Sequence, residues 1–152
     1  MAKGAIPVLF FSAWFGLQES WGPVALGGAA VLGHMFSPYV RFKGGKGVAT
    51  AAGMFLALAP LAVLIAIPVW AACLWLTGYV SLSSIMAVLS VPLSVVLFQP
   101  GEPHVFWASV ALALLIIVAH RRNIARLRAG TENRFRPRAP GPSGRAPGGP
   151  FE

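Results

Sequence analysis

Apolar residues fill this chain in long uncharged blocks that short polar turns separate. The blocks cover residues 5–17, 21–40, 48–77, 80–98 and 105–119. An α-helix needs about 20 apolar residues to cross the hydrocarbon core of a bilayer, and several blocks approach or exceed that length. The pattern predicts an all-α, polytopic integral membrane bundle of about five full or partial spans.

The block 48–77 is too long for one span, and it contains Pro60 and Pro68. Proline lacks the helix N–H donor and disfavours helix at the residue before it. We therefore predict a break at residues 59–60, giving a short helix, 48–59, and a full one, 61–77. The short helix would be about 18 Å long. Broken helices of this kind survive where protein or a polar cavity satisfies their backbone, so we expect a cavity beside it.

Composition agrees with a membrane protein. Of the 152 residues, 57 % are hydrophobic and 11 % are charged, against roughly 25 % charged in soluble domains. The net charge of +8 comes from cations gathered at residues 41–46 and 121–145. Such clusters beside apolar spans are typical of the cytoplasmic membrane edge, so we expect membrane lipids as partners and no nucleic acid. Both clusters lie on the same side of the membrane only if an even number of crossings separates them. The predicted break at residues 59–60 makes that number even, because it divides one apolar block into two helices.

The two ends of the chain differ from its middle. From residue 136 the sequence is rich in Pro, Gly and Arg, a composition typical of disorder. We predict a membrane-embedded domain over residues 1–135 and a disordered cytoplasmic tail over 136–152. The block 5–17 is short and begins close to Met1, as the second half of a helix would, so we expect that the sequence is cut.

The stretch "KGGKGVAT" carries the first candidate chemistry. Glycines let backbone N–H groups approach an anion closely, and the helix predicted from residue 48 would point its positive end back at the loop. This pattern predicts an oxyanion or phosphate cradle, formed by Gly44, Gly45, Lys46, Gly47 and Thr50. A flexible loop whose lysines only fix orientation explains the same residues equally well.

The stretch "HRRNIARLRAGTE" carries the second candidate chemistry. His120, Asn123 and Leu127 share one helical face by their spacing, and Arg126 stands among several arginines. A His and an Asn aimed together at the mouth of a bundle can orient a hydroxyl or an oxyanion. Glu132 follows a helix-ending glycine, so it is free to turn back or to pair with an arginine. A basic membrane-edge helix with incidental His and Asn is the alternative.

Two further polar groups have simpler interpretations. His34 lies about one turn before the polar edge, where a packing role is the more common one. Ser81, Ser83 and Ser84 in "YVSLSSI" are expected on the opposite side of the membrane, with their hydroxyls as helix-start caps.

Together, "GHMFSPYVRFKGGKGVAT", "YVSLSSI" and "HRRNIARLRAGTE" resemble the bacterial acyl-phosphate-dependent glycerol-3-phosphate acyltransferases, the PlsY family. The likeness covers residues 3 to about 134. It implies a bundle with seven helices in full-length members, set in the bacterial inner (cytoplasmic) membrane with the active-site loops in the cytoplasm. The implied reaction moves an acyl group from acyl phosphate to the sn-1 hydroxyl of glycerol 3-phosphate, in phospholipid synthesis. No cofactor and no metal are implied.

The resemblance also assigns residues. Lys46, His120 and Asn123 match catalytic positions, and Gly44, Gly45, Lys46, Gly47 and Thr50 match the phosphate-binding motif. His34, Arg126 and Glu132 match supporting positions. The chain departs from the family at its start, where a first helix and a Ser/Arg motif are expected. Either the start codon is misassigned or this is a shortened, inactive copy.

Two other functions remain open from the sequence. A small transporter could use the broken helix as a midplane anion site, but it would need polar residues deep in the spans. A non-catalytic protein that binds anionic lipid through its arginines would not need His120 and Asn123 on one face.

Overall fold

The computed structural model describes residues 1–17, 21–37 and 44–135. Every regular element within these ranges is helical, which confirms the predicted all-α class. The elements are α1 (Ala2–Ile6), the π turn η1 (Pro7–Phe11), α2 (Ser12–Trp14), α3 (Trp21–Met35), α4 (Val48–Leu58), α5 (Pro60–Thr77), α6 (Val80–Phe98), α7 (Pro103–Ala119) and α8 (Arg121–Arg128). The predicted disordered tail, 136–152, and the cations at 41–43 lie outside the described residues.

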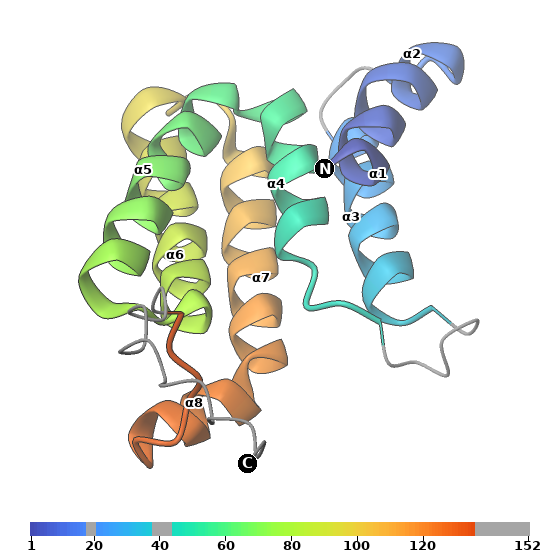
Figure 1. Ribbon diagram of the computed structural model, residues 1–152. Helices are drawn as coiled ribbons and strands as arrows, with labels where there is room; N and C mark the ends of the chain where they lie inside the picture. Colours follow the sequence, from blue (N-terminus) through green and yellow to red (C-terminus); the bar gives the residue numbers. More distant parts are fainter. Residues whose placement is uncertain (18–20, 38–43, 136–152) are drawn as a thin grey trace, which may run out of the picture.

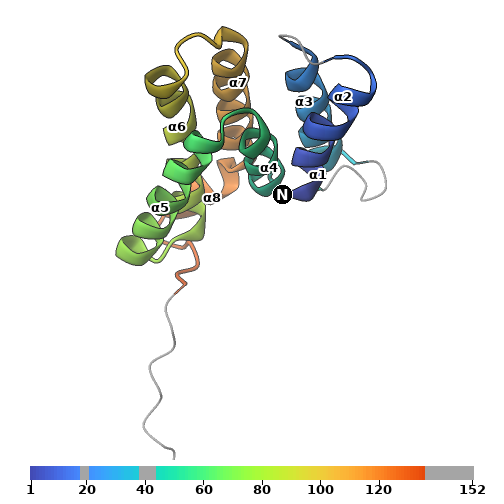
Figure 2. The same cartoon turned by 90° about the horizontal axis from the view of Figure 1, so that it is seen from above.

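Helices α4 and α7 occupy the middle of the bundle. Helices α1 to α3 pack on one side of them, and α5 and α6 pack on the other (Figures 1 and 2). The loop before α4, the turn between α5 and α6, and α8 all lie at the same end of the bundle, which we call the site end (Figure 1). The α4–α5 turn and the α6–α7 link lie at the opposite end.

The predicted break in the long apolar block is confirmed. Helix α4 ends at Leu58, Ala59 takes the non-helical dihedrals φ −146° and ψ 68°, and Pro60 begins α5. Proline suits this position because the first N–H of a helix has no intrahelical partner. Ala59 is fully buried. The 11-residue α4 is therefore about 16 Å long and turns back before it could cross a bilayer.

Two other predicted boundaries need correction. The first helical stretch runs from Ala2 to Trp14 with a π turn inside it, where we expected 5–17. The π turn begins at Pro7, which has no N–H to donate. Helix α3 ends at Met35, whereas the apolar pattern predicted helix to residue 40. The hydrophobic pattern carries no signal for the end of a helix, so the predicted helix was too long.

The outward surfaces suit a hydrocarbon environment. Helices α5 and α6 are each long and apolar enough to span a membrane, and α7 with α8 makes a third if that pair, bent by 58°, is counted as one span. Trp75 and Leu76 on α5 are 91 % and 83 % exposed. In water such a surface would be unfavourable, so the structure agrees with the predicted membrane bundle.

Glycines bring α1 and α4 into direct contact. A Cβ at Gly4 would lie 2.0 Å from the carbonyl oxygen of Thr50 and 2.8 Å from the amide nitrogen of Met54. A Cβ at Gly53 would lie 1.9 Å from the carbonyl oxygen of Met1. Small residues permit close backbone approach between helices in membranes, where packing replaces the hydrophobic effect as the source of association. This contact sets the position of the first turns of α4.

Gly4→Ala should therefore separate α1 from α4, because the backbone atoms that its methyl group meets cannot move aside. We expect a loss of about 1–3 kcal/mol in the free energy of unfolding, the range for overpacking, measured by thermal unfolding in detergent. Gly28→Ala is the matched control, since a Cβ at that helical glycine meets nothing within 4 Å. Equal melting temperatures for the two variants would contradict the packing described.

Candidate active site

The Gly/Lys loop lies against the end of α3. A Cβ at Gly44 would lie 2.1 Å from the carbonyl oxygen of His34 and 2.7 Å from that of Met35. A Cβ at Gly45 would lie 2.5 Å from Nε2 of His34. The atoms that a Cβ would meet at Gly44 belong to the backbone, so only glycine allows this approach there, and the packing brings the His34 side chain to the predicted cradle.

The loop leads directly into the start of α4. Gly47 precedes the helix with φ 82°, a left-handed conformation that glycine adopts without strain. The amides of Val48 to Thr50 come before the first intrahelical bond, which Ala51 donates to the Gly47 carbonyl at 2.8 Å. These N–H groups and the helix dipole make this end positive. Thr50 lies in this first turn and is 4 % exposed.

Lys46 adds a charged amine at the edge of this positive end. Its pKa is lowered, chiefly by partial burial; the Glu132 carboxylate opposes the shift and the Arg126 guanidinium adds to it. Lys46 therefore lies within electrostatic reach of the C-terminal motif, 80 and more residues later in the chain.

His120 stands at the junction between α7 and α8. The two helices meet at 58°, and His120 is 2 % exposed. Its Nδ1 lies 2.8 Å from the carbonyl oxygen of Ile116. Because a carbonyl only accepts, we assign the hydrogen to Nδ1, which leaves the lone pair on Nε2 of the neutral ring.

The charge state of His120 follows from its surroundings. Burial lowers the pKa of the imidazole; the bond to the Ile116 carbonyl raises it, the Lys46 charge lowers it and the Glu132 carboxylate raises it. The net shift is downward from 6.5, so the ring is neutral at pH 7. A neutral His120 can accept a hydrogen bond at Nε2.

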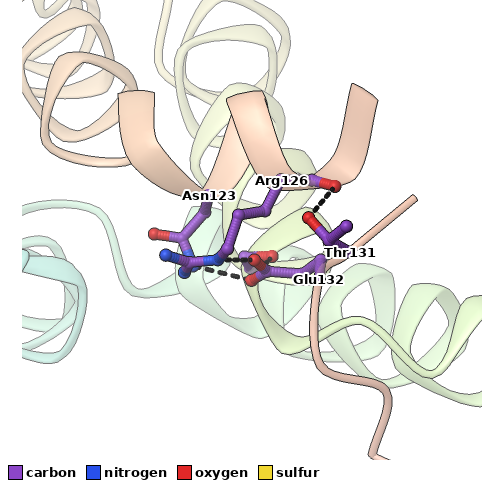
Figure 3. Close-up of polar contacts among 5 residues, drawn as sticks. Asn123, Arg126, Thr131 and Glu132 are labelled. Carbon is purple, nitrogen blue, oxygen red and sulfur yellow. Dashed lines mark hydrogen bonds and ion pairs between the residues drawn. The ribbon is translucent and has the colours of Figure 1, made fainter. Parts of the chain in front are cut away.

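Glu132 connects three side chains from two helices. Its Oε1 accepts a hydrogen bond from Asn123 Nδ2 at 2.7 Å, and Arg126 Nε donates to Oε2 at 2.6 Å (Figure 3). Ser81 Oγ also donates to Oε1, at 2.7 Å. The carboxylate side chain is 8 % exposed. Such bonds favour the ionised form. The bond from Asn123 is the largest cause that lowers the pKa of Glu132 to about 2, and those from Arg126 and Ser81 add to it against the effect of burial.

The residues after Glu132 also bind the turn between α5 and α6. Arg134 Nε donates to Tyr79 Oη at 2.8 Å, and the Phe135 amide donates to the Gly78 carbonyl at 2.6 Å. Segment 131–135 therefore holds the end of α8 against the turn between α5 and α6. His120 and Asn123 are held in place by contacts at both ends of this short helix.

The predicted position of the serines was wrong. Ser81 lies at the site end and donates to Glu132, not on the opposite side of the membrane. Ser83 and Ser84 donate to the carbonyls of Tyr79 and Val80, so none of the three caps the helix start. The error was one of counting: two helices follow the Gly/Lys loop before Ser81, and they return the chain to the side where it began.

An apolar cavity of about 420 Å³ opens beside these groups. It lies among α4, α5, α6 and α7 and begins next to the first turn of α4 and one turn from His120. Its walls include Val48, Ala52, Val80, Ala87, Ala113 and Ile116. The cavity was expected from the broken helix, although its apolar lining was not.

The structure thus brings the predicted residues together at one end of the bundle. Glu132 contacts Asn123 and Arg126 directly, His34 lies against Gly45, and the Lys46 charge helps to lower the pKa of His120. Ser81, Tyr79 and Arg134 were missed as partners of the C-terminal motif, and only a correct count of crossings could have pointed to them. Among the described residues, no three His, Cys, Asp or Glu side chains group as metal ligands.

Comparison with known proteins gives the context for this site. The family described as "Glycerol-3-phosphate acyltransferase" matches residues 1–130. The chain belongs to the glycerol-3-phosphate acyltransferase family. This confirms the family predicted from the three motifs and, at that level, the class of enzyme.

Individual relatives agree. The glycerol-3-phosphate acyltransferase of Geobacter metallireducens is 52 % identical over 135 residues, which cover 88 % of this chain and 68 % of the relative. That of Trichlorobacter lovleyi is 48 % identical over 138 residues, with the same coverage. This chain therefore spans about two thirds of the length of these relatives.

Solved structures of the family share the fold. The lysophosphatidic acid form of PlsY, an integral membrane glycerol 3-phosphate acyltransferase, superposes with a TM-score of 0.79 at 42 % identity, covering 88 % of this chain and 67 % of that one. The glycerol 3-phosphate form gives 0.78 at 43 %, covering 87 % and 65 %. The predicted membrane helical bundle is confirmed by this match.

Glu132→Gln should remove an acid-dependent part of the stability. Since the fold lowers the pKa of this carboxyl from 4.5 to about 2, its contribution is complete above about pH 4.5 and is lost as the pH falls towards 2. Melting temperatures of the wild type in detergent should decline across that window, whereas those of the variant should be lower at neutral pH and flatter in acid. Glu102→Gln, an exposed carboxylate at the opposite end paired with His104, should keep the wild-type profile. An unchanged acid decline in Glu132→Gln would refute this role.

Proposed function

We propose that this chain transfers an acyl group from acyl phosphate to the sn-1 hydroxyl of glycerol 3-phosphate, giving lysophosphatidic acid and inorganic phosphate. The reaction takes place at the site end, where Lys46, His120 and Asn123 act on the substrates. No coenzyme takes part in the proposed step.

One observation carries this proposal: a positive anion-binding end and an apolar cavity meet at the same place. The start of α4 presents amides that precede the first intrahelical bond, and Lys46 adds its amine beside them; the 420 Å³ cavity begins in the same turn of α4. An acyl phosphate combines those two chemical characters, with a charged head and a hydrocarbon tail. The names of the relatives and the glycerol 3-phosphate form of the matched structure support the second substrate.

The leaving phosphate is the part of the reaction that Lys46 and α4 assist. Breaking the acyl C–O bond to phosphate leaves negative charge on the phosphate oxygens. The amides of Gly45 and Gly47, the Thr50 hydroxyl and the Lys46 charge stabilise that charge as it develops. Preorganised donors of this kind contribute most where water is excluded.

Alignment of the attacking hydroxyl is the part that α8 assists. His120 Nε2 accepts a hydrogen bond from the sn-1 hydroxyl, and the Asn123 amide, held by Glu132, fixes the substrate beside it. Such positioning supplies a large part of the catalysis because phosphate is already a good leaving group. The hydroxyl oxygen forms the new ester bond to the acyl carbon, and its proton passes to a phosphate oxygen of the substrates.

The membrane and the orientation are also part of the proposal. Four of the eight residues of α8 are arginines, and the positive-inside tendency places such residues in the cytoplasm. We therefore place the site at the cytoplasmic face of a bacterial inner membrane, where the water-soluble glycerol 3-phosphate is available.

Lys46→Ala should reduce kcat/KM by at least about a hundredfold, the usual loss when one donor to a developing anion is removed. The assay follows release of inorganic phosphate from acyl phosphate by protein in detergent or nanodiscs. Lys46→Arg should retain part of the activity because it keeps the charge. Lys3→Ala, which removes an exposed lysine of α1, controls for net charge. Near-normal turnover by Lys46→Ala would exclude the assigned role.

His120→Ala should lower kcat by about 10²–10⁴-fold, the range for a group that acts on a transferred proton or hydroxyl. Arg128→Ala removes an exposed side chain from α8, the helix that follows His120, and should leave kcat close to that of the wild type. A protein that only binds anionic lipid would show the reverse order, with weaker binding of anionic lipid in Arg128→Ala and no change in His120→Ala.

A further inference from the structure

The apolar cavity has a closed end as well as a mouth. The mouth lies at the site end, among Val48, Val80 and Ile116, and the far end lies among Phe55, Val63 and Val91. Along α4, Val48 and Phe55 are seven residues apart, so the cavity extends about 10 Å along this helix. Beyond this end the chain is closely packed, since Ala59 and Ala62 at the α4–α5 turn are 0 % and 3 % exposed. Along its side the cavity is open, because the lining residues Met1 and Ile67 are 58 % and 50 % exposed.

Phe55 is the largest side chain at this closed end, where the other two residues are valines. It is 3 % exposed and belongs to the packed core together with Val63 and Val91. Its ring is packed against the core on the faces turned away from the cavity, so it cannot move aside cheaply, because closely packed interiors resist added volume. A hydrocarbon chain that enters from the mouth therefore meets a fixed floor.

The walls present almost no polar atoms to such a chain. Ser84 and Ser109 are the hydroxyl side chains that line the cavity, and each already donates to a backbone carbonyl, at 2.9 Å and 2.6 Å. The indole N–H of Trp70 points to Ser84 Oγ at 3.4 Å. A hydroxylated or charged tail would find no partner here, so the lining favours an unsubstituted hydrocarbon.

We propose that Phe55 sets the longest acyl chain that the enzyme accepts. The inference rests on the proposed function, because it takes the acyl tail to be the occupant of the cavity. The methyl end of a chain of matching length reaches the ring, and a longer chain has to displace it. Shorter chains leave the floor unfilled and lose dispersion contacts. Ala87 lies midway along α6 and lines the same cavity. A larger side chain at this position would shorten the space available to the acyl chain.

The test compares chain-length profiles of three variants of the whole chain in nanodiscs. Each receives a mixture of saturated acyl phosphates, from octanoyl to stearoyl, with glycerol 3-phosphate, and mass spectrometry gives the products. Phe55→Ala should raise the ratio of longer to shorter products by about tenfold, which is the effect of one methylene in a hydrophobic pocket. Ala87→Phe should shift it in the opposite direction. Phe106→Ala is the matched control, a phenylalanine packed against the same core that does not line this cavity.

A second readout does not depend on turnover. Binding of lysophosphatidic acids of the same chain lengths is measured for each folded protein, as the rise in melting temperature with ligand. If the length preference shifts in Phe55→Ala and Ala87→Phe while no protein turns over, the chain-length role stands and the proposed reaction fails. If the wild type is active and both variants keep its length profile, Phe55 does not set the length. Failure of the wild type to bind any chain length also overturns the inference.

Discussion

The buried Glu132 carboxylate is the interaction on which the site depends. It lies beyond the end of α8, yet it accepts hydrogen bonds from α6 and α8 at the same time. A carboxylate with so little exposure would be strongly unfavourable without partners, so the three donors and the chain reversal after α8 must form together. Arg126 is half-exposed, and an exposed ion pair alone contributes little. The closed set of bonds, rather than the ion pair, holds Asn123 and the end of α7 in place.

The candidate anion-binding groups and the apolar cavity occupy different parts of the bundle. The groups able to bind anions lie at one end, and the interior behind them is lined by aliphatic and aromatic side chains. Electrostatic interactions are stronger where low-dielectric walls exclude water. The short α4 makes both parts possible, because its positive first turn borders the polar end and its later turns line the cavity.

Much of this arrangement could be predicted from local sequence. Pro60 fixed the break between α4 and α5, the uncharged blocks located the spans, and the motifs indicated Lys46, His120, Asn123 and Glu132 as neighbours. What could not be predicted depends on contacts between distant residues. The Ser81–Glu132 bond joins positions 51 apart in sequence, and the glycine contacts of α1 with α4 exist only once both helices are placed. The early end of α3 at Met35 likewise has no marker in the hydrophobic pattern.

The early turn at Ala59 has a consequence for where a lipid product would reside. Helix α4 covers about 16 Å, roughly half of a hydrocarbon core about 30 Å thick. A tail held beside it, with its head at the site end, therefore extends no deeper than a single leaflet. Such a molecule already has the depth and direction of a lipid in the adjoining monolayer. It can leave by moving sideways between helices, without flipping across the bilayer and without carrying its tail through water.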